Sequence, residues 1–160
     1  MSELEIVQLS LEHREWAEGL VRERWGDSII VTRGRIHDTS ALPGFVALKA
    51  GEPAGLATFN VEGGQCEMIS MDSLIEGIGI GGALIEAVRD EALSRDCSRL
   101  WLITTNDNQK AFKFYRKRGF RLVAVHQNAL EETRRLKPGL PLSGIDGIPL
   151  RDEIEMEIQL

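Results

Sequence analysis

The densest group of residues able to hold a ligand is a glycine-rich turn at residues 76–84. Gly77, Gly79, Gly81 and Gly82 fall within six residues, between an expected strand and an expected helix. Glycines let a backbone approach an anion closely, and the free N–H groups and dipole of a helix N-terminus attract negative charge. The turn therefore predicts a phosphate-binding site. The alternative is a tight turn packed for its own sake.

The same turn matches the dinucleotide fingerprint G-x-G-x-x-G at Gly77, Gly79 and Gly82. That fingerprint requires the first βα unit of a parallel sheet and an acidic residue about 20 positions further on. The strand before this turn belongs to an expected antiparallel meander, and the next strand ends at Thr104 and Thr105 without an acidic residue. A nucleotide-dependent oxidoreductase is therefore the weaker interpretation.

A second set of residues shares one face of an expected helix. Asn108, Ala111, Phe112 and Tyr115 stand at positions i, i+3, i+4 and i+7, and this face is expected to point inward. Tyr115 is the only tyrosine of the chain, and a phenol with a pKa of about 10 is suited to protonating a thiolate. The alternatives are a core aromatic for Tyr115 and a helix N-cap for Asn108.

Glu67 is the candidate base. It shares an expected strand face with Ile69 and Met71, so that a carboxylate stands on an otherwise apolar row. Burial there raises the pKa of a carboxylate toward the range useful for general base catalysis. The alternative is an ordinary carboxylate at a strand edge. Cys66 and Cys97 have no His or Lys nearby in the sequence, so reduced thiols are expected and a covalent acetyl-cysteine route is not.

Hydrophobic periodicity predicts the elements that position these residues. The stripe Trp16, Leu20, Val21 and Trp25 predicts a core-packed helix that Ser10 can cap. The other expected elements are a strand or helix turn at 29–32, a loop at 34–44, an antiparallel meander of strands at 45–49, 54–61 and 65–72, a helix at 82–95, a strand at 99–105, a helix at 108–118, a strand at 120–126, a long loop at 138–149 and a strand at 154–160.

Composition indicates one soluble α/β domain spanning residues 1–160, with 42% hydrophobic and 28% charged residues. A core of this size needs no structural metal, and no metal-ligand spacing occurs. The net charge of -6 argues against nucleic acid as a partner. The basic run at residues 108–121 is either a solvated helix face or a site for a small anionic group. No membrane-spanning segment and no secretory signal are found, so a cytoplasmic location is expected.

Two motifs together resemble the GCN5-related N-acetyltransferase (GNAT) family. The pair Gly79-x-Gly81 after a meander is similar to the family's motif A, although Glu76 stands where the family usually has Gln or Arg. Asn108-x-x-Ala111, followed by Tyr115 and then Gly119-Phe120, looks like its motif B. The likeness runs from about residue 45 to residue 126, and it implies a single α/β (α+β) domain with a mixed, mostly antiparallel sheet flanked by helices.

The resemblance also implies roles for the residues. Acetyl-CoA is the implied cofactor, used as a co-substrate without a metal, with its pyrophosphate on the N–H groups of Ile78, Gly79, Ile80, Gly81 and Gly82. Main-chain groups of Ile69, Ser70 and Met71 match the positions that bind pantetheine and polarise the acetyl oxygen. Asn108 matches a pantetheine contact, Tyr115 the general acid and Glu67 the general base.

The predicted function is direct transfer of the acetyl group from acetyl-CoA to a primary amine. The alternative is a non-catalytic acyl-CoA-binding module on the same fold. The acidic residues of the first 80 positions favour a cationic acceptor, whereas Arg134, Arg135 and Lys137 favour an anionic one, so polyamines, amino sugars, amino acids and protein amino termini all stay open. The oligomeric state stays open too, with a homodimer as one outcome.

Overall fold

The computed structural model describes residues 3–160. Its strands are β1 (Leu4–Gln8), β2 (Ile29–Thr32), β3 (Arg35–Asp38), β4 (Gly44–Lys49), β5 (Glu52–Glu62), β6 (Gln65–Ser73), β7 (Arg99–Thr105), β8 (Arg121–His126) and β9 (Glu153–Gln159). Its helices are α1 (Leu11–Trp25), α2 (Ile80–Ser94), α3 (Gln109–Lys117) and α4 (Ala129–Leu136), with 3-10 turns at Thr39–Ala41 and Ile145–Gly147.

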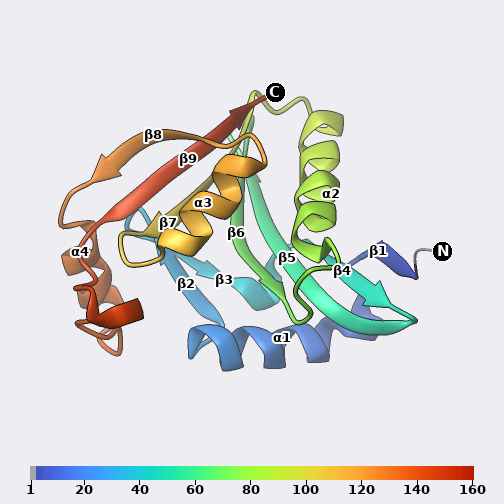
Figure 1. The fold of residues 1–160 in the computed structure, drawn as a ribbon, viewed down its shortest axis with the longest axis horizontal. Helices are drawn as coiled ribbons and strands as arrows, with labels where there is room; N and C mark the ends of the chain where they lie inside the picture. Colours follow the sequence, from blue (N-terminus) through green and yellow to red (C-terminus); the bar gives the residue numbers. More distant parts are fainter. Residues whose placement is uncertain (1–2) are drawn as a thin grey trace.

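Seven strands form one mixed sheet in the order β1-β4-β5-β6-β7-β9-β8, and β2 and β3 form a separate hairpin. Only the β6–β7 pair of the large sheet is parallel. This confirms the predicted mixed, mostly antiparallel sheet flanked by helices. The final strand β9 lies between β7 and β8, so the two strands on either side of α3 are not neighbours (Figure 1).

The two faces of the sheet carry two cores. Helix α1 packs its buried residues Ala17, Leu20 and Val21 on one face, against the side chains of β4, β5 and β6. Helix α2 covers the other face, where Leu84 and Val88 are fully buried and the aromatic residues of α3 pack alongside (Figure 1). Within residues 3–160, no helix is long and apolar enough to cross a membrane.

Several predicted elements need correction. Ser10 is the N-cap residue of α1, but its side chain makes no capping hydrogen bond. The predicted loop at 34–44 contains β3 and a 3-10 turn. Arg33 and Gly34 both have positive φ, at 49° and 72°, as a two-residue type I′ hairpin turn requires. Arg-Gly is not a common sequence for that turn, so little in the sequence indicated the β2–β3 hairpin.

Helix α4 was not predicted, because only Leu130 and Thr133 of its residues are buried.

A further correction concerns which face of the sheet each side chain of β6 occupies. Thr58 pairs with Ser70 and Phe59 pairs with Met68, which leaves Ile69 as an extra residue at a bulge. Met71 consequently packs on the α2 side, whereas Ile69 packs on the α1 side. The prediction that Met71 shares a face with Glu67 and Ile69 is therefore wrong.

Candidate functional site

A cavity of about 720 Å³ opens where β6 and β7 separate. Their pairing stops at Met68 and Leu102, although β6 continues along β5 to Ser73 and β7 continues along β9 to Thr105. Beyond Met68, the main-chain groups on the β7 side of β6 therefore have no partner strand. This agrees with the expectation that Ile69, Ser70 and Met71 offer free main-chain groups, and all three line the cavity.

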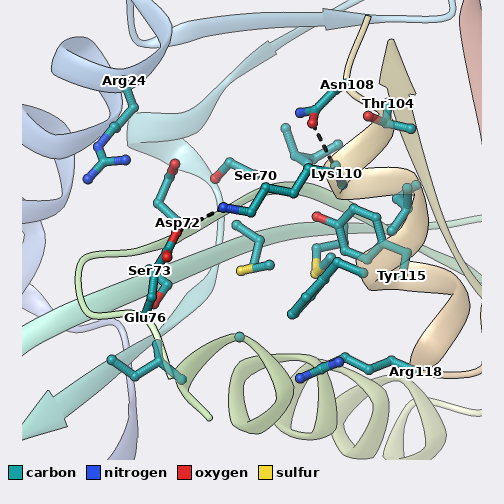
Figure 2. A pocket seen from close by; sticks show the side chains of 18 of the residues that line it. Arg24, Ser70, Asp72, Ser73, Glu76, Thr104, Asn108, Lys110, Tyr115 and Arg118 are labelled. Carbon is teal, nitrogen blue, oxygen red and sulfur yellow. Dashed lines mark hydrogen bonds and ion pairs between the residues drawn. The ribbon is translucent and has the colours of Figure 1, made fainter. Parts of the chain in front are cut away.

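Most residues predicted for the site line this cavity. The predicted residues that do so are Ile69, Ser70, Met71, Gly79, Ile80, Gly81, Asn108 and Tyr115. Ile78 does not line it, and Gly82 lines a neighbouring cavity of about 510 Å³ instead. Glu67 lies outside both cavities. The turn, the strand and the helix expected to act together are thus brought to one place (Figure 2).

The glycine-rich turn delivers the N-terminus of α2 to the cavity. Gly79 is the N-cap residue, with a left-handed backbone at φ 84° that a side chain would strain. The N–H groups of Ile80, Gly81 and Gly82 belong to the first turn of the helix, which has no intrahelical acceptors for them. A Cβ on Gly81 would lie 2.7 Å from Cζ of Phe114, so glycine is needed for the close approach of α2 and α3. The predicted anion site is therefore present as geometry.

Glu76 places a carboxylate next to the glycine-rich turn. Lys110 at the start of α3 donates to its Oε1 from 3.0 Å, and both side chains are exposed (Figure 2). The ammonium group offsets the negative charge that Glu76 would otherwise present to a phosphate. The departure from the family motif thus has a local compensation in the same cavity wall.

Tyr115 reaches the cavity from α3 (Figure 2). Its ring is held edge-on between Phe114 and Phe120, at centroid distances of 5.4 and 5.5 Å. Its hydroxyl has no hydrogen-bond partner among residues 3–160. Burial and then the negative charge of Asp72 raise the pKa of Tyr115 above its ordinary value. The phenol therefore stays protonated and is free to donate.

Asn108 is the N-cap of α3, as the structural alternative predicted. Its Oδ1 accepts from the backbone N–H of Ala111 at 3.0 Å. The same residue lines the cavity, so the cap also places the Asn108 side chain at the site (Figure 2). Ser70 is different, because its hydroxyl is buried and lies 2.6 Å from the hydroxyl of Thr58. Ser70 therefore offers the cavity its main chain rather than its side chain.

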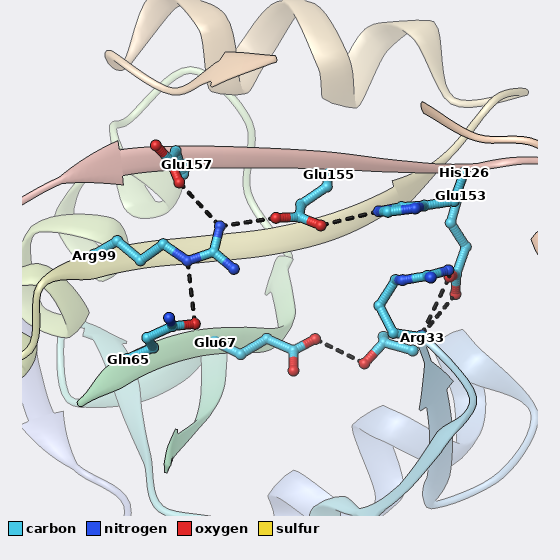
Figure 3. Close-up of polar contacts among 9 residues, drawn as sticks. Arg33, Gln65, Glu67, Arg99, His126, Glu153, Glu155 and Glu157 are labelled. Carbon is cyan, nitrogen blue, oxygen red and sulfur yellow. Dashed lines mark hydrogen bonds and ion pairs between the residues drawn. The ribbon is translucent and has the colours of Figure 1, made fainter. Parts of the chain in front are cut away.

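Glu67 lies on the α1 side of the sheet, only 4% exposed. Thr32 of β2 donates to Oε2 of Glu67 at 2.7 Å (Figure 3). Nε2 of His37 lies 3.7 Å from Oε1 of Glu67. Burial raises the pKa of Glu67 to about 7, although the Thr32 bond and the charge of Arg35 oppose the rise. The environment expected for a general base is present, but this carboxylate fastens the β2–β3 hairpin to the sheet and does not line the cavity.

Ion pairs cover the neighbouring part of the same sheet (Figure 3). Arg99 donates to both Glu155 and Glu157, at 2.8 and 2.9 Å. Arg33 pairs with the buried Glu153, and His126 lies 2.9 Å from Glu155. The alternating glutamates of β9 are thus neutralised by basic side chains from β7, β8 and the hairpin.

The basic run on α3 divides between the cavities. Lys110 and Arg118 line the main cavity, and Lys117 and Arg118 line the neighbouring one together with Arg89 of α2. The guanidinium of Arg118 also stacks on the Phe114 ring, 4.0 Å from its centroid. Some residues of this run thus lie on the solvated surface, and others line a cavity where a small anionic group would meet positive charge.

Sequence reasoning missed several lining residues that come together only in the fold. Arg24 and Trp25 end α1, and the Trp25 indole N–H donates to Oδ2 of Asp72 on β6 at 3.1 Å. Trp25 was expected in the core, but it is 40% exposed and lies in the cavity wall. The sequence indicated only that Trp25 stands at the end of the apolar stripe of α1. Thr104 and Thr105 also line the cavity.

The two cysteines do not take part in the site. Cys66 and Cys97 are buried free thiols and line neither cavity. Burial raises the pKa of the Cys66 thiol to about 12, which removes the thiolate needed for nucleophilic attack. Among the residues described, no group of three or more His, Cys, Asp or Glu side chains is arranged to hold a metal ion.

Comparison with known proteins places the chain in a family. Residues 7–120 match the model of the Acetyltransferase (GNAT) family. The uncharacterized protein YdhI of Bacillus subtilis is 44% identical over 133 residues, which cover 82% of this chain and 83% of that protein.

Solved structures share the fold. An IAA acetyltransferase from Bacillus cereus superposes with a TM-score of 0.74 at 19% identity, covering 98% of this chain and 99% of the other. A GNAT family acetyltransferase from Elizabethkingia anophelis with acetyl-CoA bound superposes with a TM-score of 0.70 at 17% identity over the full length of both chains. With the family model matching residues 7–120 and a relative that is 44% identical over most of the chain, this chain belongs to the GNAT family of acetyltransferases.

Proposed function

We propose that this protein transfers the acetyl group of acetyl-CoA directly to a primary amine. The observation that carries the proposal is the splay of β6 from β7, which brings free main-chain groups, the N-terminus of α2 and the hydroxyl of Tyr115 to one cavity. The acetyl-CoA bound to the Elizabethkingia anophelis relative, on the same fold, supports this choice of co-substrate.

Each wall of the cavity has a proposed task. The first-turn N–H groups of α2 bind the pyrophosphate, and Lys110 shields it from Glu76. The main chain of Ile69 to Met71 binds the pantetheine and orients donors toward the acetyl oxygen, where fixed donors lower the barrier by about 3 kcal/mol each. These contacts fix the thioester between β6 and β7.

Tyr115 is the proposed general acid. Its phenol is protonated at neutral pH, since the ordinary pKa of tyrosine is about 10 and burial raises it further. It has no competing hydrogen bond within residues 3–160. The proton it gives up goes to the sulfur as the C–S bond breaks. The sequence predicted Glu67 as the base. Because Glu67 lies outside the cavity, it reaches the amine only through a water chain.

The proposal is tested by calorimetric titration with acetyl-CoA, followed by a thiol-release assay against an amine panel. The panel contains spermidine, glucosamine, glycine and the dipeptide Ala-Gly, one member for each acceptor class left open. Saturable binding and amine-dependent thiol release support the proposal. Saturable binding without thiol release from any amine would instead favour the non-catalytic acyl-CoA-binding module.

A further inference from the structure

One carboxylate in the cavity has no task in the mechanism above. Asp72 lies in the splayed part of β6, two residues after Ser70, and it lines the cavity. The indole N–H of Trp25 holds its Oδ2 at 3.1 Å. Its Oδ1 has no hydrogen-bond partner among residues 3–160. The carboxylate is thus fixed by one oxygen and open to a ligand at the other.

Asp72 and Tyr115 line the same cavity from different walls, β6 and α3 (Figure 2). After burial, the negative charge of Asp72 is the second cause that raises the pKa of Tyr115. A proton acceptor and a proton donor therefore face one space, as acyl transfer from a thioester to an amine requires.

The charged groups around Asp72 are few. Arg24 of α1 carries a positive charge that opposes the effect of burial, and burial dominates, so that the pKa of Asp72 lies above its ordinary value. Of the other charged side chains that line the cavity, Glu76 and Lys110 are paired with each other, and the guanidinium of Arg118 stacks on the Phe114 ring. Asp72 is therefore the cavity carboxylate without an ion-pair partner in the described part of the chain.

Glu67 compares poorly with Asp72 as a contact for the acceptor. It lies outside the cavity, Thr32 occupies its Oε2, and His37 stands 3.7 Å from its Oε1. A base must come within hydrogen-bond reach of the proton it removes, directly or through one water. Its position in the cavity thus favours Asp72 as the proton acceptor, whereas the sequence pattern favoured Glu67 for this role.

We propose that Asp72, positioned by Trp25, binds the acceptor as an ammonium ion and accepts one of its protons. The inference rests on the proposed acetyl transfer and adds the acceptor class, a primary amine that arrives as a cation. Trp25 acts as a positioning residue, because it touches the carboxylate of Asp72.

The step balances in atoms and electrons. One ammonium proton moves to Oδ1 of Asp72, and the freed nitrogen lone pair forms the C–N bond. The C–S bond breaks with its electron pair on sulfur, and Tyr115 gives its proton to that sulfur. The amide nitrogen loses its second proton to solvent. Asp72 then releases its proton to solvent and Tyr115 takes one back, so one proton is released per turnover.

Asp72→Asn is the central variant, because an Asn oxygen can still accept from Trp25. With the best acceptor of the panel and saturating acetyl-CoA, kcat/KM for the amine is expected to fall about 100-fold or more. The acidic limb of its pH profile is expected to disappear, while the Kd for acetyl-CoA stays within twofold. Glu76→Gln removes the same charge from the cavity and is expected to change acetyl-CoA affinity while keeping the acidic limb.

Two outcomes overturn the inference alone. The first is an Asp72→Asn enzyme with the wild-type profile for an amine that the wild type acetylates. The second is loss of the acidic limb in Glu67→Gln but not in Asp72→Asn. If acetyl-CoA binds and no amine of the panel releases thiol even from the wild type, the proposed function fails and the inference falls with it.

A second readout does not depend on turnover. The indole N–H resonance of Trp25 reports the protonation of Asp72 directly, and the resonances of Trp16 and Trp101 serve as internal controls. Titration of the Trp25 resonance above the ordinary pKa of Asp, and its shift on addition of the best amine, would support the inference. A Trp25 resonance whose chemical shift stays unchanged at amine concentrations that saturate turnover would contradict the inference.

Discussion

The replacement Glu67→Gln changes how the stability of this protein depends on pH. Burial raises the folded-state pKa of Glu67 from 4.5 to about 7. Between these two values the folded state binds more protons than the unfolded chain does, so the free energy of unfolding falls as pH rises. At about 1.4 kcal/mol per pKa unit, this group alone removes about 2 to 3 kcal/mol between pH 5 and pH 8.

Glutamine keeps the hydrogen bond from Thr32 but does not titrate. The free energy of unfolding of Glu67→Gln, measured relative to that of the wild type, is therefore expected to rise by about 2 to 3 kcal/mol between pH 5 and pH 8. Urea unfolding of both proteins at the two pH values measures this difference, and other titrating groups cancel in the comparison. Thr32→Val, which removes a bond that lowers the pKa of Glu67, is expected to steepen the loss, with Thr32→Ser as its control. A wild-type and Glu67→Gln difference that is the same at both pH values would refute the reasoning.

Three further predictions concern the cavity and its walls. Tyr115→Phe is expected to lower kcat about 100-fold or more while leaving the calorimetric Kd for acetyl-CoA unchanged, since only proton donation is lost; an unchanged kcat removes Tyr115 from the mechanism. Gly81→Ala places a Cβ 2.7 Å from an aromatic ring and is expected to cost about 1–3 kcal/mol in thermal unfolding. The matched control Gly19→Ala, where a Cβ meets nothing within 4 Å in mid-helix, is expected to stabilise by about 0.5–1 kcal/mol; equal effects would contradict the close approach. Lys110→Met is expected to weaken acetyl-CoA binding about threefold to fivefold, less at high salt, whereas Lys113→Met on the same helix, outside the cavity, is expected to have a smaller effect. Equal Kd values for the two variants would remove Lys110 from the anion site.

The parts of the fold that follow from local periodicity were predictable from the sequence. The strand at Arg99–Thr105 and the helices α2 and α3 carry strong apolar stripes or alternation, and they lie within a few residues of their predicted places. The glycine-rich turn before α2 was predictable as well, because glycine is the residue that tolerates the left-handed backbone at Gly79.

The rest depends on contacts between distant segments. Trp25 and Asp72 are 47 residues apart, and nothing in the local pattern of either indicates that they share a hydrogen bond. The bulge at Ile69 moves Met71 to the opposite face of β6, which period-two reasoning cannot detect. Glu67 shows the same limit, since its apolar strand face predicted a raised pKa but not its distance from the cavity.

The most direct test of the central claim is a calorimetric titration of the purified protein with acetyl-CoA, with NAD titrated in parallel. The geometry of the α2 N-terminus and the splayed strands predicts saturable binding of acetyl-CoA, with NAD silent. No binding of acetyl-CoA at millimolar concentration would contradict the account, and with it the tasks given to Tyr115 and Asp72.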